Sequence, residues 1–120
     1  MKILPHVLLI EDDLNIATGL QKVMRANGYE VTLQTRGDDG LAAALAGSFD
    51  IVITDLKLPG TDGLEVVRQL HQAKPKLPII LITAHGTTET ASEATKWGAF
   101  DYVPKPFEFE DLLDLTAKAL

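Results

Sequence analysis

The chain has 120 residues, of which 46% are hydrophobic and 23% are charged, a composition typical of one folded domain with its own core. Its net charge of −6 argues against a general nucleic-acid surface, because phosphate contacts need clustered lysines and arginines. The absence of cysteine excludes disulfides and thiolate metal sites, and the apolar runs are too short to span a membrane. The first residues lack the apolar core and cleavage site of a secretory signal, so we expect a cytoplasmic location.

Strands and helices are predicted to alternate along the whole chain. Apolar runs bounded by polar or turn residues predict strands near residues 6–11, 30–35, 50–55, 78–83 and 100–104. Helical spacing and terminators predict helices near residues 14–27, 37–47, 62–73, 87–98 and 108–120. In the first helix this spacing places one apolar face on Ile16, Leu20, Val23 and Met24, with Gly28 as the stop. Such alternation predicts a parallel sheet with helices on both faces.

The predicted strands differ in hydrophobicity, and this difference orders them in the sheet. Residues 7–10, 51–53 and 79–82 are apolar throughout, as in strands that are covered on both faces. Residues 30–34 alternate, and Pro104 lies in the fifth strand; both features are typical of edge strands. We therefore predict a doubly wound, flavodoxin-like α/β sheet of order 2-1-3-4-5, whose topological switch lies between strands one and three.

Acidic residues follow two of the predicted inner strands. Glu11, Asp12 and Asp13 come directly after the first strand, and Asp55 ends the third. The carboxyl ends of these strands meet at the topological switch, so these carboxylates are expected to face one crevice. Their mutual repulsion costs free energy unless a cation lies between them, and oxygen ligands of this kind favour a divalent metal.

Two further polar residues end strands at the same predicted edge. Thr83 closes the fourth strand, and Lys105 follows the fifth. Each of these residues has a simpler explanation when it is taken alone: a turn residue for Asp55, an ordinary strand residue for Thr83 and a solvated charge for Lys105. For Asp13 we prefer a helix N-cap over metal ligation. Acids, a hydroxyl and an ammonium at one edge of a sheet together favour a shared site over these separate explanations.

Four stretches resemble the receiver domain of two-component response regulators, over essentially the full length of residues 1–120. They are Leu-Leu-Ile-Glu-Asp-Asp (8–13), Ile-Thr-Asp-Leu-Lys-Leu-Pro-Gly-Thr-Asp-Gly (53–63), Ile-Thr-Ala (82–84) and Gly-Ala-Phe-Asp-Tyr-Val-Pro-Lys-Pro-Phe (98–107). The resemblance implies that Asp55 is the phosphoacceptor. It also implies a Mg²⁺ site, in which Mn²⁺ can substitute, formed by Glu11, Asp12, Asp55 and the backbone carbonyl of Lys57.

The same resemblance implies the remaining site residues. Thr83 matches the switch hydroxyl, Tyr102 the switch aromatic and Lys105 the phosphate-binding lysine, with a cis peptide bond between Lys105 and Pro106. The expected signalling surface consists of the fourth helix, the fifth strand and the fifth helix. The predicted fourth helix has only a weak apolar stripe, Ala91 and Ala94, which is consistent with a surface that shifts.

The resemblance also implies the partners. A sensor histidine kinase or a phosphotransfer protein would donate the phosphoryl group, and a receiver homodimer is a further expectation. Neither nucleic acid nor membrane should be contacted directly, and no output domain is expected within residues 1–120. The runs at residues 86–90 and 98–102 resemble receivers attached to AAA+ transcription activators of the nitrogen-regulatory type.

The chemistry of these residues is coherent with phosphoryl transfer. A carboxylate can attack phosphorus and form an acyl phosphate, and this transfer needs positioning and charge neutralisation more than acid–base catalysis. We therefore expect a phosphoacceptor that assists its own phosphorylation and dephosphorylation, and not an enzyme in the usual sense. The alternatives are a Mg²⁺-dependent phosphohydrolase with an aspartyl-phosphate intermediate, which usually has an acid where this chain has Lys57, and an unphosphorylated interaction module. A flavodoxin is rejected, because acids after strand one would repel a flavin phosphate.

Overall fold

Five parallel strands form one sheet in the order β2-β1-β3-β4-β5, as predicted. The structure is a computed structural model, and it describes residues 4–84 and 88–120. The strands are β1 (His6–Ile10), β2 (Glu30–Gln34), β3 (Ile51–Asp55), β4 (Ile79–Thr83) and β5 (Asp101–Pro104). The edge positions of β2 and β5 confirm the assignment made from the alternating run and from Pro104.

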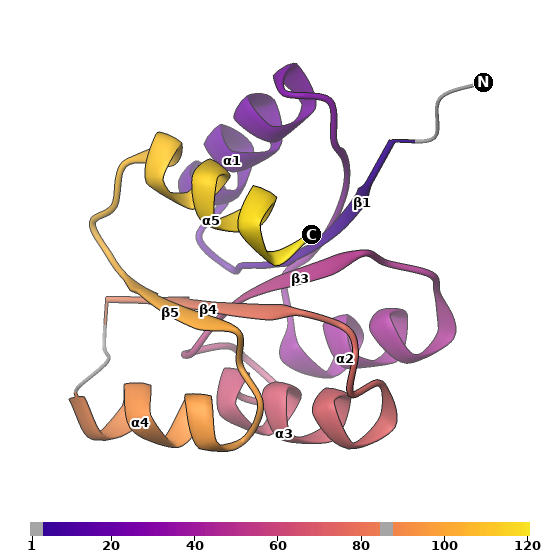
Figure 1. Ribbon diagram of the computed structural model, residues 1–120, viewed down its shortest axis with the longest axis vertical. Helices are drawn as coiled ribbons and strands as arrows, with labels where there is room; N and C mark the ends of the chain where they lie inside the picture. Colours follow the sequence, from indigo (N-terminus) through magenta and orange to yellow (C-terminus); the bar gives the residue numbers. More distant parts are fainter. Residues whose placement is uncertain (1–3, 85–87) are drawn as a thin grey trace.

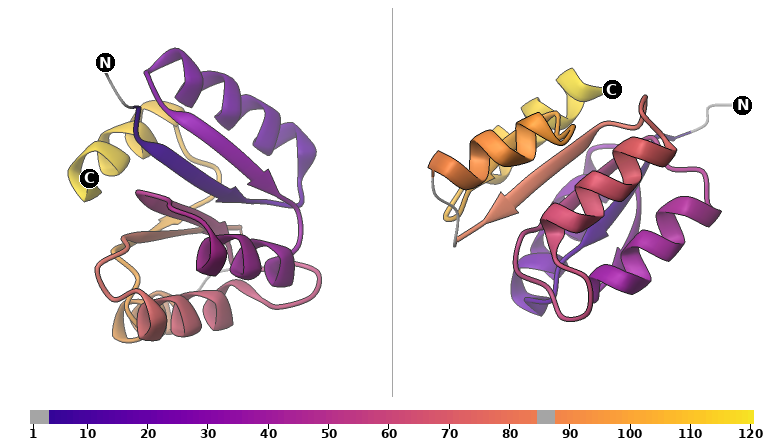
Figure 2. Two further views of the ribbon diagram at one scale, coloured as in Figure 1. Left: turned by 90° about the vertical axis from the view of Figure 1, so that its right-hand side faces the viewer. Right: turned by 90° about the horizontal axis from the view of Figure 1, so that it is seen from below.

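Helices cover both faces of the sheet, as Figures 1 and 2 show. They are α1 (Leu14–Ala26), α2 (Gly37–Ala46), α3 (Gly63–Ala73), α4 (Thr88–Lys96) and α5 (Phe109–Ala119). One face carries α1 and α5, and the opposite face carries α2, α3 and α4 (Figure 1). The described strands and helices agree with the predicted boundaries within two residues at each end; residue 87, where the fourth helix was expected to begin, lies outside the described residues.

The register of the sheet aligns the carboxyl ends of its inner strands. Ile10, the last residue of β1, pairs with Thr54 of β3 and with Gln34 of β2. The next residue along each inner strand is therefore an acid, Glu11 on one and Asp55 on the other. Figure 2 shows β1 and β2 side by side and running in the same direction. Parallel register thus places residues that are far apart in the sequence at one edge.

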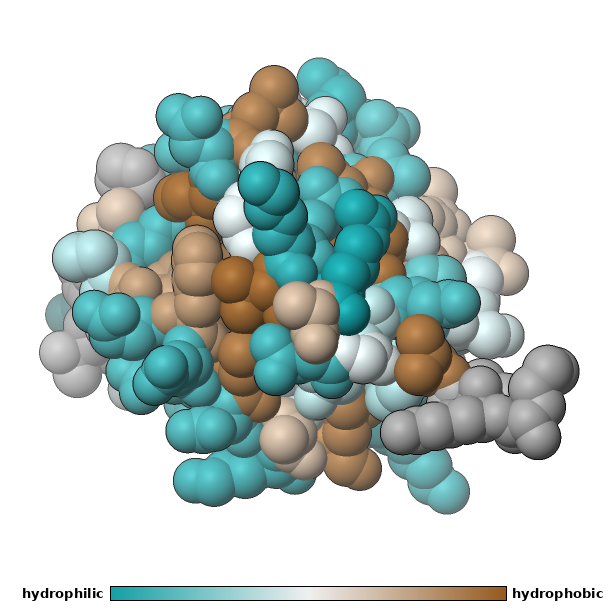
Figure 3. Space-filling model, turned by 90° about the horizontal axis from the view of Figure 1, so that it is seen from above, coloured by the Kyte–Doolittle hydropathy of each residue, from teal (hydrophilic) through white to brown (hydrophobic). Residues whose placement is uncertain are grey.

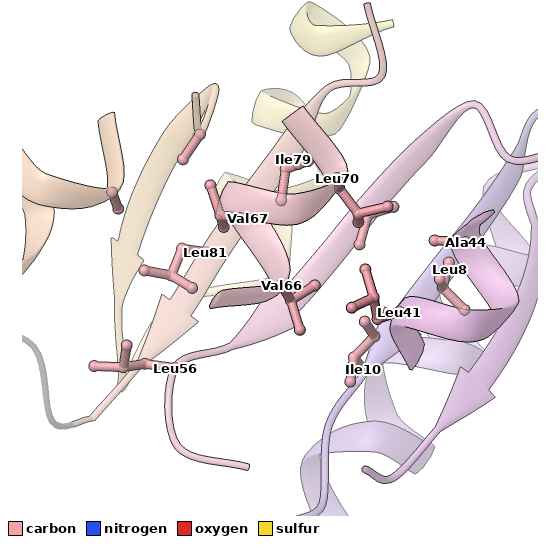
Figure 4. Packing of buried hydrophobic residues seen from close by; sticks show 13 residues of the cluster. Leu8, Ile10, Leu41, Ala44, Leu56, Val66, Val67, Leu70, Ile79 and Leu81 are labelled. Atoms are coloured by element: carbon pink, nitrogen blue, oxygen red, sulfur yellow. The ribbon is translucent and has the colours of Figure 1, made fainter. Parts of the chain in front are cut away.

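Two apolar clusters hold the helices on the sheet. The cluster under α2 and α3 includes Val66, Val67 and Leu70, which point at residues of β1 and β4 in Figure 4. The cluster under α1 and α5 contains Ala17, Leu20 and Met24 of α1 and Leu112 of α5. Since the inner strands are buried on both faces, each contributes alternate side chains to the two clusters.

Helix α1 begins and ends where local chemistry requires. The side chain of Asp13 accepts hydrogen bonds from the backbone N–H groups of Asn15 and Ile16, at 3.0 and 3.4 Å, which confirms its N-cap role. At the other end Gly28 has φ of +90°, a left-handed conformation that strains any residue with a Cβ. The chain therefore leaves the helix here and enters β2.

Figure 3 looks onto the side of α1 and α5, where apolar residues gather near the middle of the face and hydrophilic residues surround them. The large apolar residues with the most exposure are Leu4, Leu14, Leu45, Phe100, Phe109 and Leu120. Among the described residues no helix is both long and apolar enough to cross a membrane.

The core position of Leu70 supports a stability prediction. Leu70→Ala should lower the free energy of unfolding by about 2–5 kcal/mol, because the side chain is fully buried between α3 and the sheet. Leu45→Ala is the matched control: this leucine is also helical but 44% exposed, so its loss should cost about 0.5 kcal/mol or less. Urea denaturation followed by circular dichroism measures both values; equal losses would contradict the core described above.

Candidate functional site

Three carboxylates converge where β1 and β3 end. Glu11 and Asp12 follow β1 directly, and Asp55 is the last residue of β3. One oxygen from each carboxylate lies within 4.8 Å of the other two. Glu11 is fully buried and Asp55 is 5% exposed, whereas Asp12 is exposed. The sequence prediction that these acids share one crevice is therefore confirmed.

Lys105 binds two of these acids. Its Nζ donates to Oε1 of Glu11 at 2.6 Å and to Oδ2 of Asp55 at 2.9 Å. Lys105 follows β5, which lies two strands from β3 in the sheet. Its backbone N–H donates to the carbonyl of Thr83 at 2.8 Å, so the lysine is held at the end of β4, next to Asp55. A single cation thus lies between two buried anions, which reduces the electrostatic cost of burying them.

Backbone N–H groups complete the environment of the same carboxylates. The Leu56 N–H donates to Oδ1 of Asp55 at 2.6 Å, so both oxygens of that carboxylate accept a hydrogen bond. The Asp13 N–H donates to Oε2 of Glu11 at 3.1 Å. Charge-assisted hydrogen bonds of this kind fix the orientation of each carboxylate plane.

Burial and the neighbouring charges shift two pKa values in the site. Burial raises the pKa of Glu11 from 4.5 to about 7; the hydrogen bonds from Lys105 and Asp13 oppose this effect, and the charge of Asp55 adds to it. Burial would by itself lower the pKa of Lys105, but hydrogen bonds and charges from Glu11 and Asp55 outweigh it and raise that pKa. Lys105 therefore stays a cation.

Asp12 and Asp55 open into a cavity of about 330 Å³. Its walls are formed by Asp12, Asp13, Ile16, Asp55, Lys57, Ala84 and Lys105. Carboxylates with a backbone carbonyl and water are the ligand set that Mg²⁺ prefers. The residues present therefore fit a receiver-type Mg²⁺ site, with Glu11, Asp12 and Asp55 close together and Lys57 on the same wall.

The remaining expected site residues lie on the neighbouring strands. Thr83 is 1% exposed and ends β4, next to β3 and in register with Pro104. Tyr102 does not line the acidic cavity; it is half-buried on the α4 side of the sheet and lines a separate groove with residues of α4. The peptide bond between Lys105 and Pro106 is cis, as the resemblance implied.

Two features of the site were not anticipated. The first is the hydrogen bond between Lys105 and Glu11, since the resemblance implied a phosphate-binding role for Lys105 and no contact with Glu11. The second is the Leu56 N–H, a backbone donor that belongs to no residue type and leaves no sequence signal. The turn after Asp55 was recognisable from Pro59 and Gly60, but not its hydrogen bonds.

Comparison with known proteins gives one consistent family. Residues 7–117 match the response regulator receiver domain. The chain is 42% identical over 115 residues to the transcriptional regulatory protein YkoG of Bacillus subtilis, which covers 96% of this chain and 50% of that protein. It is 35% identical over 114 residues to the DNA-binding transcriptional regulator NtrC of Salmonella typhimurium, covering 95% of this chain and 24% of that protein. It is 38% identical over 114 residues to the transcriptional regulatory protein ZraR of the same organism, covering 95% of this chain and 26% of that protein. The chain thus spans half or less of the length of these relatives.

Solved structures share the same fold. A response regulator receiver domain protein from Methanospirillum hungatei has a TM-score of 0.92 at 28% identity, covering 98% of this chain and 94% of that one. A receiver domain protein from Clostridium thermocellum has a TM-score of 0.90 at 31% identity, covering 97% of this chain and 94% of that one. NtrX from Brucella abortus has a TM-score of 0.89 at 29% identity, covering 98% of this chain and 27% of that one.

The raised pKa of Glu11 predicts how stability depends on pH without metal. This carboxyl titrates near 4.5 when unfolded and about 7 when folded, so the folded state holds its proton longer. The protonated carboxyl therefore stabilises the folded state most below pH 4.5. This stabilisation, about 3 kcal/mol at most, is lost as pH rises through 7. In EDTA, Glu11→Gln should remove this decline relative to wild type.

Urea titrations from pH 4.5 to 8 measure the effect. Glu65→Gln is the control, because hydrogen bonds from Arg68 and Gln69 lower the pKa of Glu65 to about 2 and keep it ionised throughout. A difference between wild type and Glu11→Gln that stays constant across this range would contradict the assigned environment of Glu11.

Proposed function

Because the chain belongs to the response regulator receiver domain family, we propose that Asp55 accepts a phosphoryl group in a Mg²⁺-dependent reaction. A receiver domain implies a cognate histidine kinase, and we propose a sensor kinase or a phosphotransfer protein as the direct donor. The single observation that supports this most is the Asp55 carboxylate, which is nearly buried, fixed by two hydrogen bonds and open to the acidic cavity. In this proposal residues 1–120 form the one receiver domain.

The reaction proposed for Asp55 is nucleophilic substitution at phosphorus. One carboxylate oxygen forms a bond to phosphorus while the bond from phosphorus to the donor nitrogen or oxygen breaks, and the leaving group keeps that electron pair. The hydrogen bonds to both oxygens hold Asp55 in place, so little reorganisation is needed before attack. The product is an aspartyl phosphate.

Charge neutralisation is the second requirement. Mg²⁺ bound by Glu11, Asp12, Asp55 and the Lys57 carbonyl would neutralise charge on the transferring phosphoryl oxygens. Lys105 already lies 2.9 Å from Asp55 and would turn its ammonium to a phosphoryl oxygen once Asp55 is phosphorylated. Its present hydrogen bonds to Glu11 and Asp55 support this role.

We propose that phosphorylation is read out through β4 and β5. Thr83 would move toward the phosphoryl oxygens, and Tyr102 would turn into the space that it leaves, which changes the surface of α4, β5 and α5. Of the described side chains of α4 only Ala94 is buried, so few apolar contacts resist a shift of this helix. The named relatives are transcriptional regulators, so we propose that this surface controls transcription through a further domain or partner.

The assignment of Asp55 predicts the outcome of phosphorylation in vitro. With acetyl phosphate or phosphoramidate and Mg²⁺, the wild-type chain should gain the mass of one phosphoryl group, and EDTA should abolish this gain. Asp55→Asn should gain none, because an amide is a much poorer nucleophile. Asp50→Asn serves as the control, since Asp50 is exposed just before the opposite end of β3 and bonds the His6 N–H.

Intact-protein mass spectrometry and release of inorganic phosphate measure the two outcomes. Modification of Asp55→Asn at the wild-type rate would refute the assignment. Sustained phosphate release over many turnovers, without accumulated phosphoprotein, would favour the phosphohydrolase instead.

The proposed role of Thr83 predicts a smaller conformational response in its absence. Beryllofluoride with Mg²⁺, a mimic of the phosphoryl group, should shift backbone amide resonances of residues 88–107 in the wild-type chain. Thr83→Ala should still bind the mimic but shift those resonances less than half as far, since the hydroxyl contact is missing. The control is Thr32→Ala on edge strand β2, whose hydroxyl bonds His6. Full-sized shifts in Thr83→Ala would exclude this hydroxyl from the signalling route.

A further inference from the structure

The loop between β3 and α3, residues 56–62, lies against the beginning of α2. The backbone N–H of Gly37, the first residue of α2, donates to the carbonyl of Pro59 at 3.0 Å. The two segments come from different β-α units, and the hydrogen bond joins them directly. This loop also contains Lys57, which lies on the wall of the acidic cavity.

Gly37 leaves no room for a side chain at this contact. A Cβ on Gly37 would lie 2.6 Å from the carbonyl carbon of Thr61 and closer still to its oxygen, nearer than real Cβ contacts come. Both atoms belong to the backbone, so they cannot swing aside as a flexible side chain would. Any other residue at this position must push the loop away from α2 or move the helix.

A second glycine brings the tip of the loop to the same helix. Gly60 has φ of +78°, and a Cβ there would lie 2.7 Å from Cγ of Asp38. Arg36 and Asp38 form an exposed ion pair next to it, with Nε to Oδ1 at 3.1 Å. Exposed pairs of this kind contribute little energy and their side chains can move, so the backbone contact between Gly37 and the loop is the firmer restraint.

The ends of the loop are fixed on the side of the phosphoacceptor. The Leu56 N–H donates to Oδ1 of Asp55, and the Gly63 N–H donates to the carbonyl of Leu56 at 2.8 Å. Between these anchors, Pro59, Gly60 and Thr61 are the loop residues whose position the contact with α2 restrains. Lys57 lies between the two sets of restraints.

We propose that Gly37 is a positioning residue for the metal site: it lets α2 hold the loop in the place where the Lys57 carbonyl completes the Mg²⁺ ligands. The inference rests on the proposed function, because it assigns Lys57 as a ligand. Gly37 acts only through the loop and contacts neither metal nor phosphoryl group. Outer groups that orient a metal ligand commonly contribute a factor of about ten or more to metal affinity.

Mg²⁺ titration of the Gly37→Ala variant tests this role. Its dissociation constant, measured by calorimetry well below the melting temperature, should rise about tenfold over wild type. The rate of phosphorylation by acetyl phosphate should recover when Mg²⁺ is raised to saturation, because Asp55 itself is unchanged. Gly47→Ala is the matched control: it adds the same methyl group after the other end of α2, against the ring of Phe49 and the carbonyl of Ala43. Its Mg²⁺ affinity should equal that of wild type.

A second variant keeps the proposal testable if Gly37→Ala does not fold. Gly60→Ala strains the tip of the loop and presses on the exposed side chains of Arg36 and Asp38, which can move aside, so it should fold and also weaken Mg²⁺ binding. In metal-free protein it should speed hydrogen exchange of the Gly37 amide, because the hydrogen bond to Pro59 is loosened. Wild-type Mg²⁺ affinity in Gly60→Ala and in any folded Gly37→Ala would overturn the positioning role. Failure of the wild-type chain to bind Mg²⁺ would instead overturn the proposed function itself.

Discussion

Two buried carboxylates, those of Glu11 and Asp55, share the ammonium group of Lys105, and the rest of the site is arranged around this contact. Burying an anion without a partner costs several kcal/mol, so neither acid would be tolerated here alone. The cation offsets part of that cost, and the N–H groups of Asp13 and Leu56 satisfy the remaining carboxylate oxygens. Glu11 still carries a raised pKa, because the effect of burial outweighs the hydrogen bonds from Lys105 and Asp13, and the charge of Asp55 adds to it.

The parallel sheet explains why such a costly arrangement can exist. All of its strands end at one edge, so polar groups collect there while the strand interiors remain apolar and bind the helices. The two apolar clusters carry the stability of the domain, and the edge is free to hold strained or repelling groups. The helices on the two faces differ in how firmly they are held. Helices α2 and α3 contribute several buried side chains to the core, whereas Ala94 is the one buried side chain among those described in α4, which adjoins a groove that includes Tyr102. A buried site beside a helix with few buried side chains fits the proposed switch.

Much of this architecture could be predicted from residue patterns because each pattern has a local cause. Apolar runs that are continuous indicate strands covered on both faces, and an alternating run or a proline indicates an edge, which together determine the strand order. The acids Glu11, Asp12 and Asp55 could be assigned to one site because each directly follows or ends an inner strand. The face of α1 was predicted less well: Ala17 is fully buried, whereas Ile16 is only half-buried and lines the acidic cavity. A small residue carries a weak hydrophobic signal, although the close approach of a neighbouring element can bury it completely.

The sequence by itself determined the sheet order, the strand and helix boundaries and the residue types gathered at the carboxyl edge, since these depend on periodicity and on what lies at the end of each strand. Tertiary structure alone decided which groups contact one another there. Lys105 bonds Glu11 and Asp55 across separations of 94 and 50 residues, and no spacing in the chain encodes that choice. The Leu56 N–H at Asp55 and the contact of Gly37 with the loop after β3 involve backbone atoms, which every residue carries. Such contacts arise only when packing brings distant segments within hydrogen-bond distance, because the backbone has no residue identity for a sequence pattern to reveal.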